Sequence, residues 1–462
     1  MSVGCSANKR ITQGMDTMNK LAIGLGVVIV AGIAAAPYVS GMMIEKRMQS
    51  VSALPGLSDG ITWSLDSYQR GYLSATAISH VTLAGADGTR YLIHFKHTIN
   101  QIPGVDGRYA TIQTVWVPDT EIKPQVEQLF SGKEPVVLNT ALSVFGGAHT
   151  EGEFAPINQP QVTFSGGTMT IDAAASGKFA YTGAFDSLNI TGQKDDKGMP
   201  QSAAFKGITL DADGVMDKKS HIAWNSQFAM KVASLTVGNE GALSGLALTS
   251  HSLRTGDDFA VDVGLDVANA DFSAAPPAFR TMKDLKFKYG ISRVDAPALG
   301  DIVKQAQLAQ KQTMGDPDKI KQAVSMSVMT HLPALLNAGP KFEIDPISFK
   351  LPDGTVALHF SAELPPGHGK EGMNNPMSLL NLLDMKGDFS VPEAVYQAAQ
   401  TEAGPDRQAV NEQQLQQMVQ KGYITQSNGM LSTNFAFKAG QLTINGLPAN
   451  DLLGVMAAMS AR

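Results

Sequence analysis

The feature that most constrains this chain is an uncharged segment near its N-terminus. Residues Leu21–Ile44 form 24 consecutive positions without Asp, Glu, Lys or Arg. An α-helix rises about 1.5 Å per residue, so this segment reaches about 36 Å and can cross a hydrocarbon core of about 30 Å. The sequence therefore predicts a transmembrane anchor over residues 21–44.

A cleaved signal peptide is the alternative interpretation of this segment. Ala34-Ala35-Ala36 satisfies the small-x-small pattern of a cleavage site. However, Pro37 would directly follow the cut, where it makes a poor peptidase substrate, and the apolar run continues beyond it through Met43. We therefore favour an anchor that stays attached to the rest of the protein.

Small residues recur every four positions inside the predicted anchor, at Gly32, Ala36 and Ser40. This spacing lets two membrane helices approach closely, so it indicates helix pairing and a homodimer. The alternative is that small residues are simply common in membrane helices, and the pattern alone leaves both interpretations open.

The chain beyond the anchor is expected to lie outside the cytoplasm. The single cysteine, Cys5, precedes Met18, which is itself a plausible start of translation. A body without cysteine suits an oxidising compartment. The formal net charge of −6 lacks the basic excess that binding to nucleic acid requires, so we expect no nucleic-acid partner.

The rest of the sequence is typical of antiparallel β-structure. Only 17% of the residues are charged and 45 are glycine, a composition that suits strands and tight turns better than long helices. Apolar residues alternate with polar ones in short runs, as expected for half-buried strands. Examples are Val162 and Phe164, Met169 and Ile171, Phe179 and Tyr181, Phe228, Met230 and Val232, Phe259, Val261, Val263 and Leu265, and Val356, Leu358 and Phe360.

Turn residues separate these runs. Gly, Asn and Asp supply the positive φ angles or side-chain bonds that hairpins need. The predicted turns include Gly166-Gly167, Asp213-Gly214, Pro352-Asp353-Gly354 and Asn428-Gly429. The pattern predicts a mainly β protein with one long, curved antiparallel sheet, or two.

Helical periodicity is confined to a few places, mostly in the second half. Apolar residues line one face at Leu299, Ile302, Val303 and Ala306, and a second face from Ile320 to Leu336 that Pro333 should disturb. Residues 395–420 are also predicted to be helical, with an interruption near Gly404-Pro405.

These patterns divide the chain into six predicted regions. They are a cytoplasmic N-terminus (1–20), the transmembrane anchor (21–44), a tether (45–60), a β-rich region (61–296), a helical segment (297–340) and an α+β C-terminal region (341–462).

Two stretches carry a family likeness. Tyr68, Arg70, Gly71, Tyr72 and Ser74 follow the anchor and form a Tyr-x-Arg-Gly-aromatic-x-Ser motif. Near the other end lie Gly422, Tyr423, Gly440, Asn445 and Gly446. In order and spacing these motifs resemble those of the YdgA-like bacterial proteins, a domain of unknown function. The β-rich body also resembles, more loosely, the AsmA-like proteins of the envelope.

The resemblance implies a single-pass inner-membrane protein with a periplasmic, β-rich body and no assigned enzyme activity. This chain departs from the family's pattern at one place. After the second predicted strands, where the resemblance implies a His-Gly-Pro turn, it has His97 to Gly104. On an extended strand Tyr68, Arg70 and Tyr72 share a face, which would stack Arg70 between two aromatic rings. We interpret the motif as a structural clip, with a binding surface for a lipid head group or a partner carboxylate as the alternative.

Motifs for catalysis and for cofactors are weak. The Gly56-to-Gly60 segment fits G-x-S-x-G but precedes a strand, so it lacks the helix of a hydrolase site. The closest histidines, His94 and His97, would project to opposite faces of a strand, so they could not easily coordinate one metal ion together. We therefore expect no catalytic residues, no metal and no cofactor.

The sequence supports three functional hypotheses. The first is a non-enzymatic envelope protein whose concave sheet face handles lipid or lipoprotein. The second is a scaffold or assembly factor for envelope proteins, with the sheet interior filled by side chains. The third is a hydrolase whose residues come together from distant strands.

Overall fold

The computed structural model describes residues 61–452, apart from 72–73, 85–89, 101–106, 195–199, 218–219, 221, 239, 274, 313–316, 370–378, 380, 403–404 and 451. The predicted N-terminal region, anchor and tether, with Gly32, Ala36 and Ser40, lie outside the described residues. In the part that is described, no helix combines the length and the apolar character that a membrane crossing requires.

The described strands belong to one large, open antiparallel sheet. This confirms the predicted mainly β architecture. Contacts divide the chain into two units: unit 1 comprises 1–193, 206–226 and 306–323, and unit 2 comprises 194–205, 227–305 and 324–462.

Unit 1 contains nine complete strands and one helix among its described residues. The helix is α3 (Lys123–Leu129), and the strands are β1 (Ile61–Arg70), β2 (Ser74–Ala84), β3 (Arg90–Asn100), β4 (Arg108–Val117), β5 (Val136–Ser143), β6 (Ala148–Phe154), β7 (Ile157–Asn158), β8 (Val162–Phe164) and β9 (Gly167–Ala173). Three further strands contain residues of both units: β10 (Lys178–Lys194), β11 (Pro200–Met216) and β12 (Ala223–Val237).

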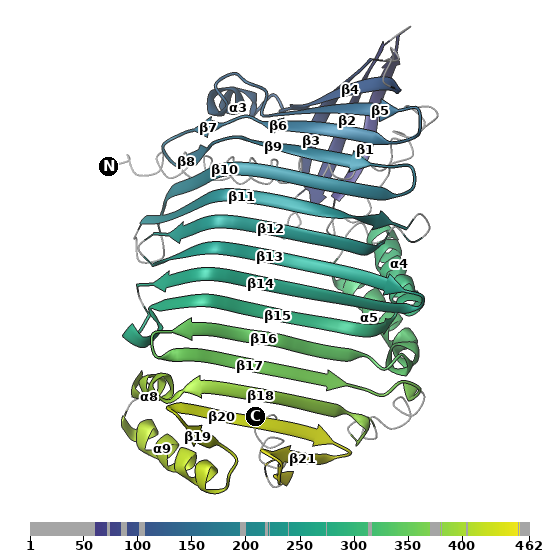
Figure 1. Cartoon of the computed structure of the whole chain (residues 1–462). Helices are drawn as coiled ribbons and strands as arrows, with labels where there is room; N and C mark the ends of the chain where they lie inside the picture. Colours follow the sequence, from purple (N-terminus) through teal and green to yellow (C-terminus); the bar gives the residue numbers. More distant parts are fainter. Residues whose placement is uncertain are drawn as a thin grey trace, which may run out of the picture. The chain divides into compact units, whose positions relative to one another are not determined.

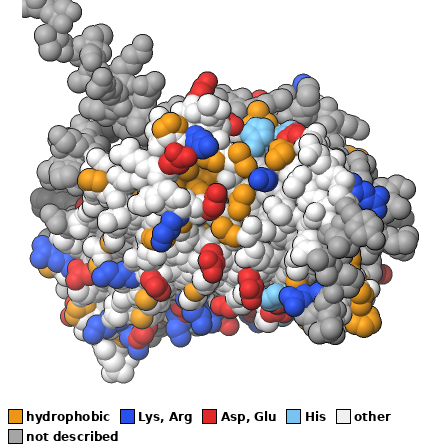
Figure 2. All heavy atoms as spheres, turned by 90° about the horizontal axis from the view of Figure 1, so that it is seen from above, with side chains coloured by type: hydrophobic (Ala, Val, Ile, Leu, Met, Phe, Trp, Pro, Cys, Tyr) orange, Lys and Arg blue, Asp and Glu red, His pale blue; other side chains and the backbone are white. Residues whose placement is uncertain are grey.

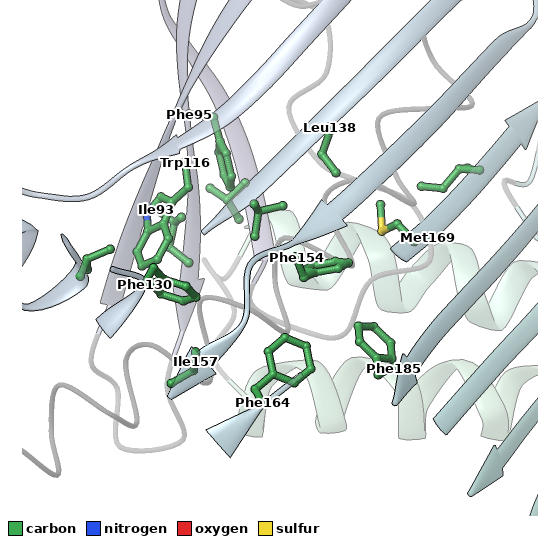
Figure 3. Close-up of a cluster of buried hydrophobic side chains, with 14 of the residues drawn as sticks. Ile93, Phe95, Trp116, Phe130, Leu138, Phe154, Ile157, Phe164, Met169 and Phe185 are labelled. Carbon is green, nitrogen blue, oxygen red and sulfur yellow. The ribbon is translucent and has the colours of Figure 1, made fainter. Parts of the chain in front are cut away.

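The core of unit 1 is a sealed cluster of apolar side chains. Strands β3 to β9, α3 and β10 each contribute residues that point toward one another (Figure 3). Phe130, directly after α3, is 1% exposed and Trp116 on β4 is 6% exposed. Strands β2 to β6 also contribute a second cluster of buried residues: Ala75, Ala77, Ile99, Ala110, Ile112, Leu142 and Ala148.

Unit 2 continues the antiparallel pairing with strands of up to fifteen residues, drawn side by side from β13 to β18 in Figure 1. Its strands are β13 (Gly241–Thr255), β14 (Asp258–Phe272), β15 (Thr281–Asp295), β16 (Lys341–Leu351), β17 (Gly354–Glu363), β18 (Asp384–Pro392), β19 (Thr425–Ser427), β20 (Met430–Lys438), β21 (Gln441–Ile444) and β22 (Leu447–Pro448).

Helices lie mostly in the second half, as predicted. They are α4 (Ala296–Gln312), α5 (Pro317–Asn337), α8 (Glu393–Glu402) and α9 (Pro405–Gln420), with a 3-10 turn, η2 (Pro277–Phe279). The predicted break near Gly404-Pro405 separates α8 from α9. Pro333, expected to disturb the second apolar helix, lies inside α5, which continues to Asn337.

One predicted turn is wrong. Asp213-Gly214 lies inside the seventeen-residue strand β11. A Cβ at Gly214 would come within 2.7 Å of the Asn225 carbonyl oxygen, so the glycine permits a close backbone approach rather than a reversal.

On the surface, acidic and basic side chains are interspersed, as Figure 2 shows for the face seen from above.

Candidate functional site

The C-terminal signature residues come together around the end of α9. Gly422 has a positive φ of 76° and its N–H donates to the Val419 carbonyl, while the Tyr423 N–H donates to the Met418 carbonyl. These two bonds form a Schellman motif, which satisfies carbonyls that a helix end leaves free. Tyr423 is then buried, and its hydroxyl donates to the Pro448 carbonyl at 3.0 Å.

Asn445 links this helix end to the neighbouring hairpins. Asn445 and Gly446 have φ of 49° and 77° and form the two-residue loop between β21 and β22. The Asn445 amide donates to the Gly422 carbonyl at 2.9 Å and accepts from the Asn434 backbone N–H at 2.9 Å. Gly440, with φ of 75°, lies in the turn between β20 and β21. These signature residues therefore fasten α9, β20 and the last hairpins together.

We expect Asn445→Ala to destabilise this part of unit 2 by about 2 kcal/mol. The substitution removes the hydrogen bonds of the amide and places an alanine at a positive φ, which costs about 1 kcal/mol alone. Hydrogen–deuterium exchange of the β20 amides measures the effect. Asn434→Ala is the control, because Asn434 uses only its backbone in this link and its side chain is exposed. Equal protection in wild type and Asn445→Ala would contradict the role of Asn445 as a link between α9, β20 and the last hairpins.

The N-terminal signature forms the first hairpin of unit 1. The Gly71 N–H donates to the Ser74 carbonyl at 2.7 Å, which closes the connection between β1 and β2. Tyr68 lies opposite Ala77 and packs, half-buried, against the second apolar cluster of unit 1, whereas Arg70 is exposed. Tyr72 lies outside the described residues, so the stacking of Arg70 between two rings stays a prediction.

One face of the unit 2 sheet carries aligned rows of apolar side chains, and we call it the apolar face. Residues directly opposite in antiparallel strands point to the same side. One aligned row across six strands consists of Leu248, Leu265, Phe287, Ile347, Leu358 and Phe389. A second row consists of Val263, Tyr289, Ile344 and Phe360.

The apolar face is not sealed as the core of unit 1 is. Each residue of the two rows is half-buried except Phe389, which is 39% exposed. Positions between the rows point to the opposite side and are polar or small, such as Asp262, Gly264 and Lys288. Aromatic rings adjoin along the apolar face: Phe342 and Phe435 lie 6.1 Å from Phe360 between centroids.

A cavity of about 710 Å³ continues the apolar face beside α8 and α9. Its walls on the sheet side are Phe389 and Val391 of β18 with Leu431 and Thr433 of β20. Leu415 comes from α9. The helix side also places polar groups around the cavity, namely Gln400, Asn411, Gln414, Gln417 and Lys421.

These polar groups leave the cavity amphipathic. The Lys421 ammonium lies 5.8 Å from the centre of the Tyr423 ring, a cation–π distance. The Asn411 amide donates to the Gln400 side chain, and the Tyr396 hydroxyl donates to the Asn411 carbonyl. Cavities of 300–1,000 Å³ with apolar walls and a few polar groups are typical of small-molecule sites.

Two buried side chains with shifted pKa values lie in unit 1. His97 on β3 is 8% exposed, with Nε2 2.8 Å from the Ser79 hydroxyl and Nδ1 2.9 Å from the Thr114 hydroxyl. Burial lowers the pKa of His97 to about 4. Burial likewise raises the pKa of Tyr181 to about 12. Both side chains lie in the interior of unit 1.

Comparison with known protein families identifies the family of this chain. Residues 18–450 match the family described as bacterial protein of unknown function (DUF945). The match spans most of the chain, which therefore belongs to this family. The Escherichia coli (strain K12) protein YdgA is 22% identical over 511 aligned positions, which cover 95% of this chain and 97% of that relative. The YdgA-like resemblance of the sequence is thus confirmed. No solved structure matches the chain.

Proposed function

We propose that this protein binds the acyl chains of envelope lipids or lipoproteins on the apolar face of unit 2. It is held in the bacterial inner membrane by residues 21–44, with its body in the periplasm. The observation that carries the proposal is the aligned, half-buried apolar row from Leu248 to Phe389, which leads into the cavity beside α8 and α9.

The physical argument concerns surface that is left open to water. Apolar surface in contact with water costs about 25 cal/mol per Å², so a folded chain rarely leaves a large contiguous apolar patch exposed. An acyl chain is long, flexible and apolar, and a row of side chains across successive strands offers it continuous contact. The amides and Lys421 around the cavity suit the polar end of such a ligand.

We expect Phe389→Asp to lower the amount of lipid that co-purifies with the full-length protein by at least about tenfold. Phe389 lies both in the apolar row and in the cavity wall, and a carboxylate against an acyl chain costs several kcal/mol. Because Phe389 is 39% exposed, the variant should still fold. Lipid extraction with mass spectrometry measures the content.

Phe145→Asp is the matched control. Phe145 is 85% exposed in unit 1, far from the apolar face in sequence, and should leave the lipid content unchanged. Both variants keep residues 21–44, so lipid or detergent bound there is common to both. Equal lipid content in all three proteins would refute the proposal. A lipid-free wild type that cross-links to a protein from position 389 would instead favour an assembly scaffold.

A further inference from the structure

A β-bulge in unit 1 directs a carboxylate toward two histidines. The register between β1 and β2 skips one residue between Leu65 and Ser67, so Asp66 has no partner in the ladder. Bulges commonly re-aim a side chain in this way. The Asp66 Oδ1 lies 2.6 Å from the His80 Nδ1 on the neighbouring strand.

The second histidine comes from the third strand. His94 on β3 lies directly opposite His80 on β2, and the two ring centroids are 5.7 Å apart. The His94 Nδ1 is 3.7 Å from the Asp66 Oδ2. One donor atom from each of the three side chains thus lies within 4.8 Å of the others. The side chains are 23–34% exposed, so an ion from solution can reach them.

A fourth group lies on the other side of His94. Asp119, shortly after β4, places Oδ1 3.7 Å from the His94 Nε2. Histidines that bind a metal through one ring nitrogen usually direct the other toward a carboxylate or carbonyl, which fixes the ring and raises its basicity. His94 has that arrangement, with Nδ1 facing the cluster and Nε2 facing Asp119.

We propose that Asp66, His80 and His94 bind a divalent transition-metal ion of the zinc type. Two imidazoles and one carboxylate suit zinc better than magnesium or calcium, which prefer oxygen ligands. Three protein ligands leave a fourth tetrahedral position for water. Binding an ion requires the three side chains to rotate from their present separations, and it replaces the hydrogen bond between Asp66 and His80.

Other histidine–carboxylate pairs in the described residues lack this convergence. His149 lies between Asp172 and Glu151, at 2.7 Å and 3.6 Å, but they face opposite ring nitrogens and no second histidine joins them. His359 pairs with Asp345 at 2.6 Å. His149 therefore provides a matched control with the same surface chemistry and no chelating geometry.

The test is zinc titration of the full-length protein by calorimetry after treatment with EDTA. We expect the wild type and His149→Asn to bind one equivalent that Asp66→Asn and His94→Gln each lose. Asp119→Asn should retain the stoichiometry and weaken the affinity by about 10–100-fold. X-ray absorption should show two nitrogen ligands at about 2.0–2.1 Å.

Tryptophan fluorescence checks that each variant is folded, because all three tryptophans, Trp63, Trp116 and Trp224, lie in unit 1. Asp66→Asn preserves the shape of the side chain and keeps the test decisive should His94→Gln not fold. The proposal is overturned by a wild type that binds no stoichiometric zinc, by binding that survives in the folded Asp66→Asn variant, or by equal loss in His149→Asn.

Discussion

Phe130→Ala is expected to lower the free energy of unfolding of unit 1 by about 3–5 kcal/mol, the usual cost of removing a fully buried phenylalanine. Phe130 follows α3 and is 1% exposed within the cluster that includes Trp116, Phe154 and Phe185 (Figure 3). The substitution leaves a cavity that strands paired on both sides cannot easily collapse. Urea unfolding followed by tryptophan fluorescence measures the loss.

Phe145→Ala is the matched control for this experiment. It makes the same chemical change fifteen residues later, in the same unit, at a side chain that is 85% exposed. Its effect should stay below about 0.5 kcal/mol. Similar losses in the two variants would mean that Phe130 is not part of a close-packed core.

Alternation of apolar residues was enough to predict several of the strands, because a sheet with one buried side favours a period of two. Phe259, Val261, Val263 and Leu265 show this, since all four lie on β14. Turn residues were less reliable. Asn428-Gly429 does reverse the chain, with φ of 51° and 73°, whereas Asp213-Gly214 pairs within a long strand, because tertiary pairing overrides local turn preference.

The Asp66 cluster was beyond the reach of the sequence, because it depends on register. His80 and His94 are fourteen residues apart, and only the β2–β3 pairing places them opposite each other. The position of Asp66 also depends on a β-bulge, and no residue type in this stretch predicts one. His97 is different: with Phe95 and Ile99 it forms an alternating set, and all three are buried. The alternation of these three residues therefore indicates from the sequence alone that His97 is buried.

His97 should make the stability of unit 1 depend on pH between about 6.5 and 4. Its pKa falls from an ordinary value of 6.5 to about 4 in the folded protein because burial disfavours the charged imidazolium. The unfolded chain therefore binds more protons in this range, and stability falls as the pH falls. At about 1.4 kcal/mol per pKa unit, the total loss is about 3 kcal/mol.

The check compares the free energy of unfolding at pH 7 and pH 4.5 for wild type and His97→Gln, using tryptophan fluorescence. Glutamine retains a polar group between Ser79 and Thr114 but does not titrate, so the variant should lose most of this difference. His149 is the opposite case, because Asp172 raises its pKa. Its small contribution is present at low pH and is lost as the pH rises, so His149→Gln should not reduce the acid sensitivity. A His97→Gln variant as acid-sensitive as the wild type would place the titrating group elsewhere.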